Sequence, residues 1–161
     1  MAWVLIGITF VVIWPAVFRM KKNLPWDVLY TNVLFGLFVQ NLADSFASFR
    51  YRAWGFFEVP QVEYRSLVVI LGVYPAFAIL IVNLFPFKSR WMTRIAYLIG
   101  WSIFSTLYEW LAVRTGIIWH IHWDLYCSFI LYPFIYYMLI LQIRLHLWLK
   151  RLPDPTRERG L

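Results

Sequence analysis

The stretch LYCSFILYPFIYYMLILQI, residues 125–143, decides the class of this protein. It contains no charged residue and consists mainly of leucine, isoleucine and aromatic side chains. A helix that crosses a lipid bilayer needs about 20 predominantly apolar residues. We therefore predict a membrane-spanning helix that begins at Leu125, stays uncharged until Arg144 and ends near Leu149.

Four other stretches have a similar length and composition. Together with the stretch described above, they give five predicted spans: residues 2–18, 28–49, 66–85, 95–113 and 125–149. Asp44 is the only charge in the second span, and Glu109 is the only charge in the fourth. The sequence thus predicts an all-α, polytopic membrane protein. Its five transmembrane helices form one bundle over residues 1–150, and residues 151–161 form a short cytoplasmic tail.

The overall composition agrees with this class. Hydrophobic residues make up 62% of the 161 residues and charged residues 14%, whereas a soluble domain has about 25% charged residues. A chain of this size cannot hide so much apolar surface from water. The composition argues against a soluble enzyme, a disordered tail and a nucleic-acid partner, and it predicts the lipid bilayer as the main partner. Cys127 is the only cysteine, so no intrachain disulfide can form.

The basic residues predict an orientation. Eleven of the 15 lysine and arginine residues lie in the connection after the first span, in the connection after the third span, and near or beyond the end of the fifth. The other four lie on the opposite side: Arg50, Arg52, Arg65 and Arg114. Loops rich in lysine and arginine stay in the cytoplasm. We therefore expect the N-terminus outside and the C-terminus in the cytoplasm. Tryptophans near the span ends, among them Trp54 and Trp123, are typical of interfacial belts.

Polar side chains lie at helical spacing on three of the predicted spans. The sets are Asn41, Asp44, Ser45 and Ser48; Ser102, Ser105, Thr106 and Glu109; and Asp124, Ser128, Tyr132 and Tyr136. An ionised group at mid-bilayer costs about 2.5–3.5 kcal/mol on insertion scales, so such residues indicate function by default. Side chains that point inward can satisfy one another's hydrogen bonds. We expect one cavity that opens outward.

The candidate site in this cavity would bind a small cation, a polar solute or a lipid headgroup. Its predicted ligand-binding residues are Asp44, Glu109, Asn41, Ser45, Ser105, Thr106, Asp124 and Ser128. In the alternative interpretation, Asp44 and Glu109 form ion pairs with Arg50, Arg52 or Arg114 and fix the helix packing.

The segment Trp119-His120-Ile121-His122-Trp123-Asp124 alternates in character. In an extended chain both histidines would face one way. His120 and His122 could then bind a divalent metal together with Glu109 or Asp124. The alternative is an interfacial segment whose tryptophans face lipid and whose histidines face water.

Three stretches resemble a family of uncharacterised small multi-pass membrane proteins from spore-forming Gram-positive bacteria. They are Leu107-Tyr108-Glu109-Trp110, then Gly116-Ile117, then Trp123-Asp124-Leu125 with Ser128. The resemblance implies a five-helix protein of the bacterial cytoplasmic membrane in which Glu109 matters. It implies no activity.

Three functions remain open at this point. The first is a non-enzymatic membrane protein whose cavity binds a ligand, as a transporter, sensor or carrier; conduction through so few helices would need a homo-oligomer. The second is a membrane-embedded, metal-dependent enzyme acting on lipid-linked substrates, with Glu109 or Asp44 as general base. The third is a structural assembly partner whose polar side chains only hold helices together.

Overall fold

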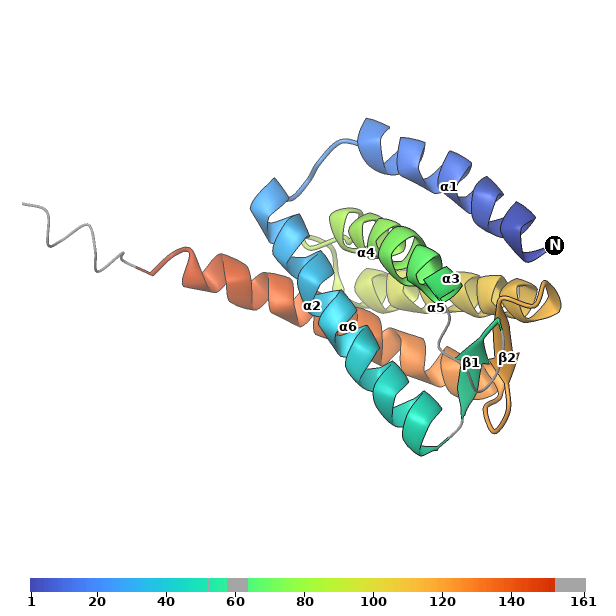
Figure 1. Cartoon of the computed structure of the whole chain (residues 1–161). Helices are drawn as coiled ribbons and strands as arrows, with labels where there is room; N and C mark the ends of the chain where they lie inside the picture. The colour runs from blue at the N-terminus through green and yellow to red at the C-terminus, as the bar shows by residue number, and fades with distance from the viewer. Residues whose placement is uncertain (52, 58–63, 153–161) are drawn as a thin grey trace, which may run out of the picture.

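The computed structural model describes residues 1–51, 53–57 and 64–152. The described chain forms five helical segments in one bundle (Figure 1). They are α1 (Ala2–Arg19); α2 (Trp26–Asp44), continued by a π-helical segment η1 (Ser45–Arg50); α3 (Tyr64–Val68), η2 (Val69–Val73) and α4 (Tyr74–Asn83) in succession; α5 (Trp91–Arg114); and α6 (Leu125–Leu149). The predicted all-helical class is confirmed, and each predicted span matches one segment to within a few residues.

Three of these segments are long and apolar enough to cross a membrane. They are Ala2–Arg19, Tyr64–Asn83 and Leu125–Leu149. This finding indicates a membrane location. The α2 and α5 helices contain more polar side chains, including Asn32, Gln40 and Asp44 on α2 and Ser102 and Glu109 on α5.

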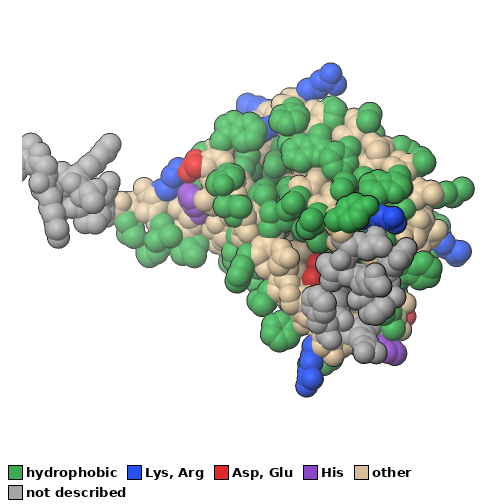
Figure 2. Space-filling view, viewed as in Figure 1, with side chains coloured by type: hydrophobic (Ala, Val, Ile, Leu, Met, Phe, Trp, Pro, Cys, Tyr) green, Lys and Arg blue, Asp and Glu red, His purple; other side chains and the backbone are tan. Residues whose placement is uncertain are grey.

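The surface of the bundle is apolar on many sides. Large side chains such as Val11, Phe38, Leu107 and Phe134 are more than half exposed. In the space-filling view, hydrophobic side chains cover much of the visible face and basic groups lie mainly at its edges (Figure 2). A soluble monomer rarely exposes apolar patches of this extent. The exposed side chains are those expected to meet lipid.

Consecutive helical segments alternate in direction (Figure 1). The N-terminus and the two strands lie at one end of the bundle, and the start of α2, the end of α4 and the end of α6 lie at the other. The basic connections around Lys21 and Lys88 and the basic end of α6 therefore share one end. Of the residues on which the predicted orientation depends, Arg52, Arg157 and Arg159 lie outside the described residues, as does the tail from residue 153 onward.

Two buried asparagines hold helices together at that basic end. Asn83, fully buried at the end of α4, accepts hydrogen bonds through Oδ1 from the backbone N–H of Asn23 (2.8 Å) and Leu24 (3.4 Å). Its Nδ2 donates to the carbonyl of Lys21 (2.8 Å). Asn32 on α2, also fully buried, donates through Nδ2 to the carbonyl of Leu139 on α6 (2.8 Å). A buried amide that is bonded in this way fixes the register of the elements that it joins.

The α1 helix packs against η2 through one glycine. A Cβ atom at Gly72 would overlap Cζ of Phe10, so a larger residue fits there only if that ring moves. Trp14 Nε1 donates to the carbonyl of Gly72 (3.1 Å). The bond gives the Gly72 carbonyl, in the π-helical segment η2, a partner from another helix. The contact holds α1 on the bundle, where Ile6 reaches the interior.

A two-stranded antiparallel sheet joins the ends of α2 and α5, a feature that the sequence did not predict. Strand β1 (Trp54–Phe56) pairs with β2 (Ile118–His120), with Trp54 opposite His120. The α5 helix ends at Arg114. Gly116, two residues later, has a φ of +78° in the left-handed region, a conformation that favours glycine just after a helix. The turn directs the chain back along α5, so that His120 returns to the level of Glu109.

Candidate functional site

Glu109 on α5 lies at the centre of a buried hydrogen-bond network. The residue is 7% exposed. Its Oε1 accepts hydrogen bonds from Ser128 Oγ (2.7 Å) and His120 Nε2 (2.8 Å), and its Oε2 accepts one from Tyr132 OH (2.6 Å). An ionised carboxylate oxygen only accepts hydrogen bonds, so beside an ionised Glu109 it is Nε2 of His120 that donates. Three charge-assisted hydrogen bonds compensate for the removal of this group from water.

The α6 helix, which packs against α5, supplies two of the three hydrogen-bond partners of Glu109. Ser128, Tyr132 and Tyr136 step by four along α6 and therefore lie on one side of it. Tyr136 OH donates to Ser105 Oγ, one turn before Glu109 on α5. The rings of Tyr132 and Tyr136 stack with their centroids 5.8 Å apart. The structure thus brings Glu109, Ser105 and Ser128 together between α5 and α6.

Asp44, the other acid that the sequence predicts inside a span, is the last residue of α2. Its Oδ1 accepts hydrogen bonds from Gln40 Nε2 (3.0 Å) and Trp54 Nε1 (3.0 Å). Its Oδ2 is buried and finds no hydrogen-bond partner among the described residues. Oδ2 of Asp44 is therefore an acceptor without a hydrogen bond in the described part of the chain, whereas both carboxylate oxygens of Glu109 accept hydrogen bonds.

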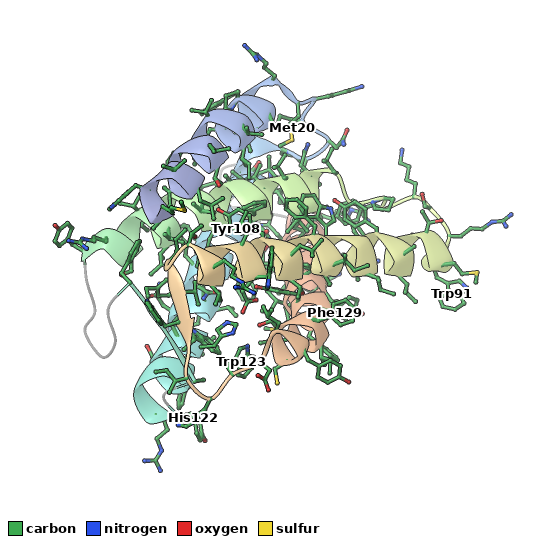
Figure 3. All side chains as sticks on the ribbon, turned by 90° about the vertical axis from the view of Figure 1, so that its right-hand side faces the viewer. Met20, Trp91, Tyr108, His122, Trp123 and Phe129 are labelled. Atoms are coloured by element: carbon green, nitrogen blue, oxygen red, sulfur yellow. The ribbon has the colours of Figure 1, made fainter. Side chains whose placement is uncertain are left out.

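Two tryptophans connect the two acids. The rings of Trp54 and Trp123 meet edge to face, with centroids 4.8 Å apart and planes at 72°. Trp54 donates to Asp44, and Trp123 Nε1 donates to Ser128 Oγ (2.7 Å), which in turn donates to Glu109. A continuous path of contacts therefore runs from one carboxylate to the other. Figure 3 labels Trp123 in the connection that leads into α6, and Tyr108 in the C-terminal half of α5.

A cavity of about 370 Å³ that is partly open to the surface adjoins this network. Its polar end is formed by Glu109, Gln40, Ser105 and Ser128, and the rest of its wall is mainly aliphatic and aromatic. The aromatic residues of the lining are Phe35, Trp54, Phe56, Tyr74, Phe77, Tyr108, Trp123, Tyr132 and Tyr136. Cavities that bind small molecules have this size and this mixture of an apolar wall with a few polar groups.

The structure leaves several predicted site residues outside the cavity wall. Asn41 and Ser45 are exposed, and their side chains bond to carbonyls of their own helix, those of Leu37 and Asn41. Thr106 likewise donates to the carbonyl of Ser102 (2.8 Å). Asp124 is exposed and precedes α6 without capping it through its side chain. These four residues were wrongly expected to face the shared cavity, because polar spacing does not reveal whether a hydroxyl or amide bonds to its own backbone. The side chain of Ser48 lies outside the described set.

The predicted ion pairs are also not formed by the described residues. Neither Asp44 nor Glu109 forms a salt bridge with Arg50 or Arg114 there. Arg114 instead lies over the ring of Trp110, at 5.6 Å from its centroid. The third candidate for pairing, Arg52, is outside the described residues.

The side chains of His120 and His122 have different surroundings. The extended segment ends at His120, and the backbone N–H groups of Ile121 and His122 both donate to the carbonyl of Ala53 (2.9 and 3.1 Å). His120 therefore bonds to Glu109, whereas His122 is exposed. Within the described part of the chain, no group of three or more histidine, cysteine or acidic side chains is placed to hold a metal ion. The predicted metal site of His120 and His122 with Glu109 or Asp124 gains no support from this part of the chain and stays a prediction.

Sequence reasoning assigned the tryptophans near span ends to interfacial belts. Trp26, Trp91, Trp119 and Trp148 are indeed exposed. Trp54 and Trp123, however, are half-buried and line the cavity. Their signal in the sequence was the same as that of the belt tryptophans, since indole suits both a wet interface and a polar interior.

Comparison with protein families, with curated proteins and with solved structures gives no match. The resemblance to membrane proteins of spore-forming bacteria therefore stays a prediction.

Proposed function

We propose that this chain is a non-enzymatic integral membrane protein that binds a small amphipathic molecule inside its helical bundle. The headgroup of this molecule would lie at the polar end of the cavity, and its apolar part would fill the remainder. The observation that carries the proposal is the cavity of about 370 Å³ with the buried carboxylate of Glu109 in its wall.

Among the ligand classes that the sequence left open, this geometry favours a headgroup with an apolar body. A bare metal cation such as Ca²⁺ requires six to eight oxygen ligands. Here three donors already occupy the oxygens of Glu109, and most of the wall offers no oxygen atoms. A wholly polar solute would lose its hydration against aliphatic side chains without replacement. An amphipathic ligand matches both parts of the wall.

The membrane topology belongs to the same proposal. The chain crosses the bilayer five times, with the strands outside and the basic end in the cytoplasm. The apolar exposed faces of all five segments and the gathering of basic connections at one end support this arrangement. Single cysteines in a Cys127→Ser background test it. A membrane-impermeant maleimide should label His122→Cys in intact cells, and Lys88→Cys only after lysis. Labelling of Lys88→Cys in intact cells, with His122→Cys labelled only after lysis, contradicts the orientation. Labelling of both variants in intact cells means that α5 does not cross the bilayer, which contradicts the five spans.

Decanol is a suitable probe for the cavity, because it combines a small polar head with an apolar chain. Added to the protein in a non-ionic maltoside micelle, decanol should raise the midpoint of thermal unfolding. A ligand that binds only the folded state at about 100 times its Kd stabilises that state by about 2.7 kcal/mol. The Ala78→Phe variant fills the cavity wall and should abolish the shift. The matched control, Ala96→Phe on an exposed face of α5, should keep it. Equal shifts in both variants would refute binding in the cavity.

One observation favours a second candidate, a purely structural role. The three donors around Glu109 come from α6 and β2, so the network holds these elements on α5 whether or not a ligand binds. In that case Glu109→Gln lowers stability and decanol shifts no variant. The metal-dependent enzyme that the sequence left open gains no support from the described residues.

A further inference from the structure

We infer that the headgroup recognised at the polar end of the cavity is an organic ammonium ion with apolar substituents. This inference rests on the proposed function and adds the charge and chemical class of the ligand. It follows from three features of one cavity: buried acids, aromatic side chains in the wall, and N–H and O–H groups that already donate to acceptors of the protein.

The charge of the cavity is the first argument. Glu109 is in its wall, and no lysine or arginine is among its described lining residues. Asp44 stands directly behind the wall, bonded to two lining residues, Gln40 and Trp54. Of the described basic side chains at that end, Arg50 and Arg114 are exposed and Arg65 is half-buried, and none of the three is among the described lining residues. A cation in the cavity would therefore meet the carboxylate of Glu109 in the wall and that of Asp44 behind it, in a medium of low dielectric constant where Coulomb attraction is strong.

The aromatic rings are the second argument. Trp54, Trp123, Tyr132 and Tyr136 line the cavity. The N–H or O–H group of each donates to a protein acceptor: Asp44, Ser128, Glu109 and Ser105 in that order. These groups are thus unavailable to a ligand, which meets the ring surfaces instead. Rings of this kind attract an ammonium ion within about 6 Å of their centroids.

The hydrogen bonds also strengthen this attraction. Trp54 donates to Asp44 and Tyr132 donates to Glu109, and a donor bonded to an anion is polarised. Polarisation of the indole N–H or phenol O–H moves electron density onto the ring, which makes its face more negative. The two acids therefore act on a bound cation both directly and through the rings.

Other headgroups fit less well. An anionic headgroup would face Glu109, while the donors of Ser128, Tyr132 and His120 are already directed to that carboxylate. A neutral headgroup such as a hydroxyl would gain little over water from acceptors that are already bonded. An ammonium ion with apolar substituents needs no donor and loses little hydration, since its alkyl groups match the wall.

Three decyl probes of equal chain length test the inference in a non-ionic maltoside micelle: decyltrimethylammonium, decanol and decyl sulfate. The concentration at which each probe gives half of its thermal shift is measured. We expect the ammonium probe to act at a concentration about tenfold lower than decanol, and decyl sulfate to act at a higher one. In Glu109→Gln the preference for the ammonium probe should fall to within about twofold of decanol.

Two further variants keep the test decisive if Glu109→Gln does not fold. Asp44→Asn retains a side-chain oxygen for Trp54 and Gln40 but removes the charge, and should reduce the preference about threefold. Asp124→Asn removes an exposed acid near the same end and should leave the preference unchanged. Equal action of decanol and the ammonium probe on the wild type overturns this inference and leaves the proposed function standing. Failure of all three probes to shift the wild type overturns both.

Discussion

Tyr132→Phe removes one hydroxyl group from the Glu109 network and leaves the rest of the side chain in place. Tyr132 OH donates to Glu109 Oε2 at 2.6 Å, the shortest of the three bonds that this carboxylate accepts. Hydrogen bonds to charged groups contribute about 1.5–3 kcal/mol. Because Oε2 would be left without this donor inside the bundle, we expect the free energy of unfolding to fall by that amount. The stacked ring of Tyr136 remains in contact with the phenyl ring, so packing changes little.

The assay is reversible unfolding in mixed micelles, in which the fraction of anionic detergent is raised and helicity is followed by circular dichroism. Tyr137→Phe is the matched control, since Tyr137 follows Tyr136 on α6 and is 48% exposed. A surface substitution of this kind changes stability by no more than about 0.5 kcal/mol. If both variants lie within about 0.5 kcal/mol of the wild type, the buried network around Glu109 does not exist as described.

Three other predictions use the same unfolding assay. Gly72→Ala should destabilise the protein by about 1–3 kcal/mol, because the added methyl group overlaps Phe10 and displaces α1; an unchanged stability would show that α1 does not pack there. Asn83→Ala should cost about 1–3 kcal/mol for each backbone group left without a partner, and a loss below about 0.5 kcal/mol would exclude the connection that the structure shows. Lys150 beside Asp27 holds the pKa of that carboxyl below its ordinary value. The contact therefore stabilises the protein above the ordinary pKa of an aspartate and is lost as the pH falls through the lowered value. Lys150→Met should remove this part of the acid sensitivity, and an identical pH profile would contradict it.

Hydropathy and charge predicted the helices well, because a run of apolar residues has few alternatives to a helix in lipid. The segment predicted at 125–149 coincides with α6. The π-helical turns η1 and η2 were not predicted, since they depend on which backbone groups find side-chain partners, such as Trp14 on Gly72. The strands were missed because three residues carry no readable periodicity, and only their pairing across the bundle makes them regular.

For the site, sequence reasoning indicated Glu109 and Ser128, whose spacing placed them on facing helices. It also grouped His120 with Glu109, as possible ligands of one metal, but did not predict the direct hydrogen bond between them, because that bond depends on the left-handed turn at Gly116 and on the pairing of β2 with β1. Nor could it separate the interior tryptophan Trp54 from belt tryptophans, since both kinds lie near the ends of spans. Which side chains meet between helices depends on how the helices pack, and a single sequence does not reveal that packing.

The central claim is that Glu109 and the paired rings of Trp54 and Trp123 line one internal site for an organic cation. An experimental structure of the protein with decyltrimethylammonium tests it most directly. The account predicts density for the probe in the cavity, with the ammonium nitrogen within about 6 Å of an indole ring and the decyl chain among aliphatic side chains. A cavity filled by side chains, a Glu109 side chain that faces the lipid, or a probe found only on the outer surface of the bundle would contradict it.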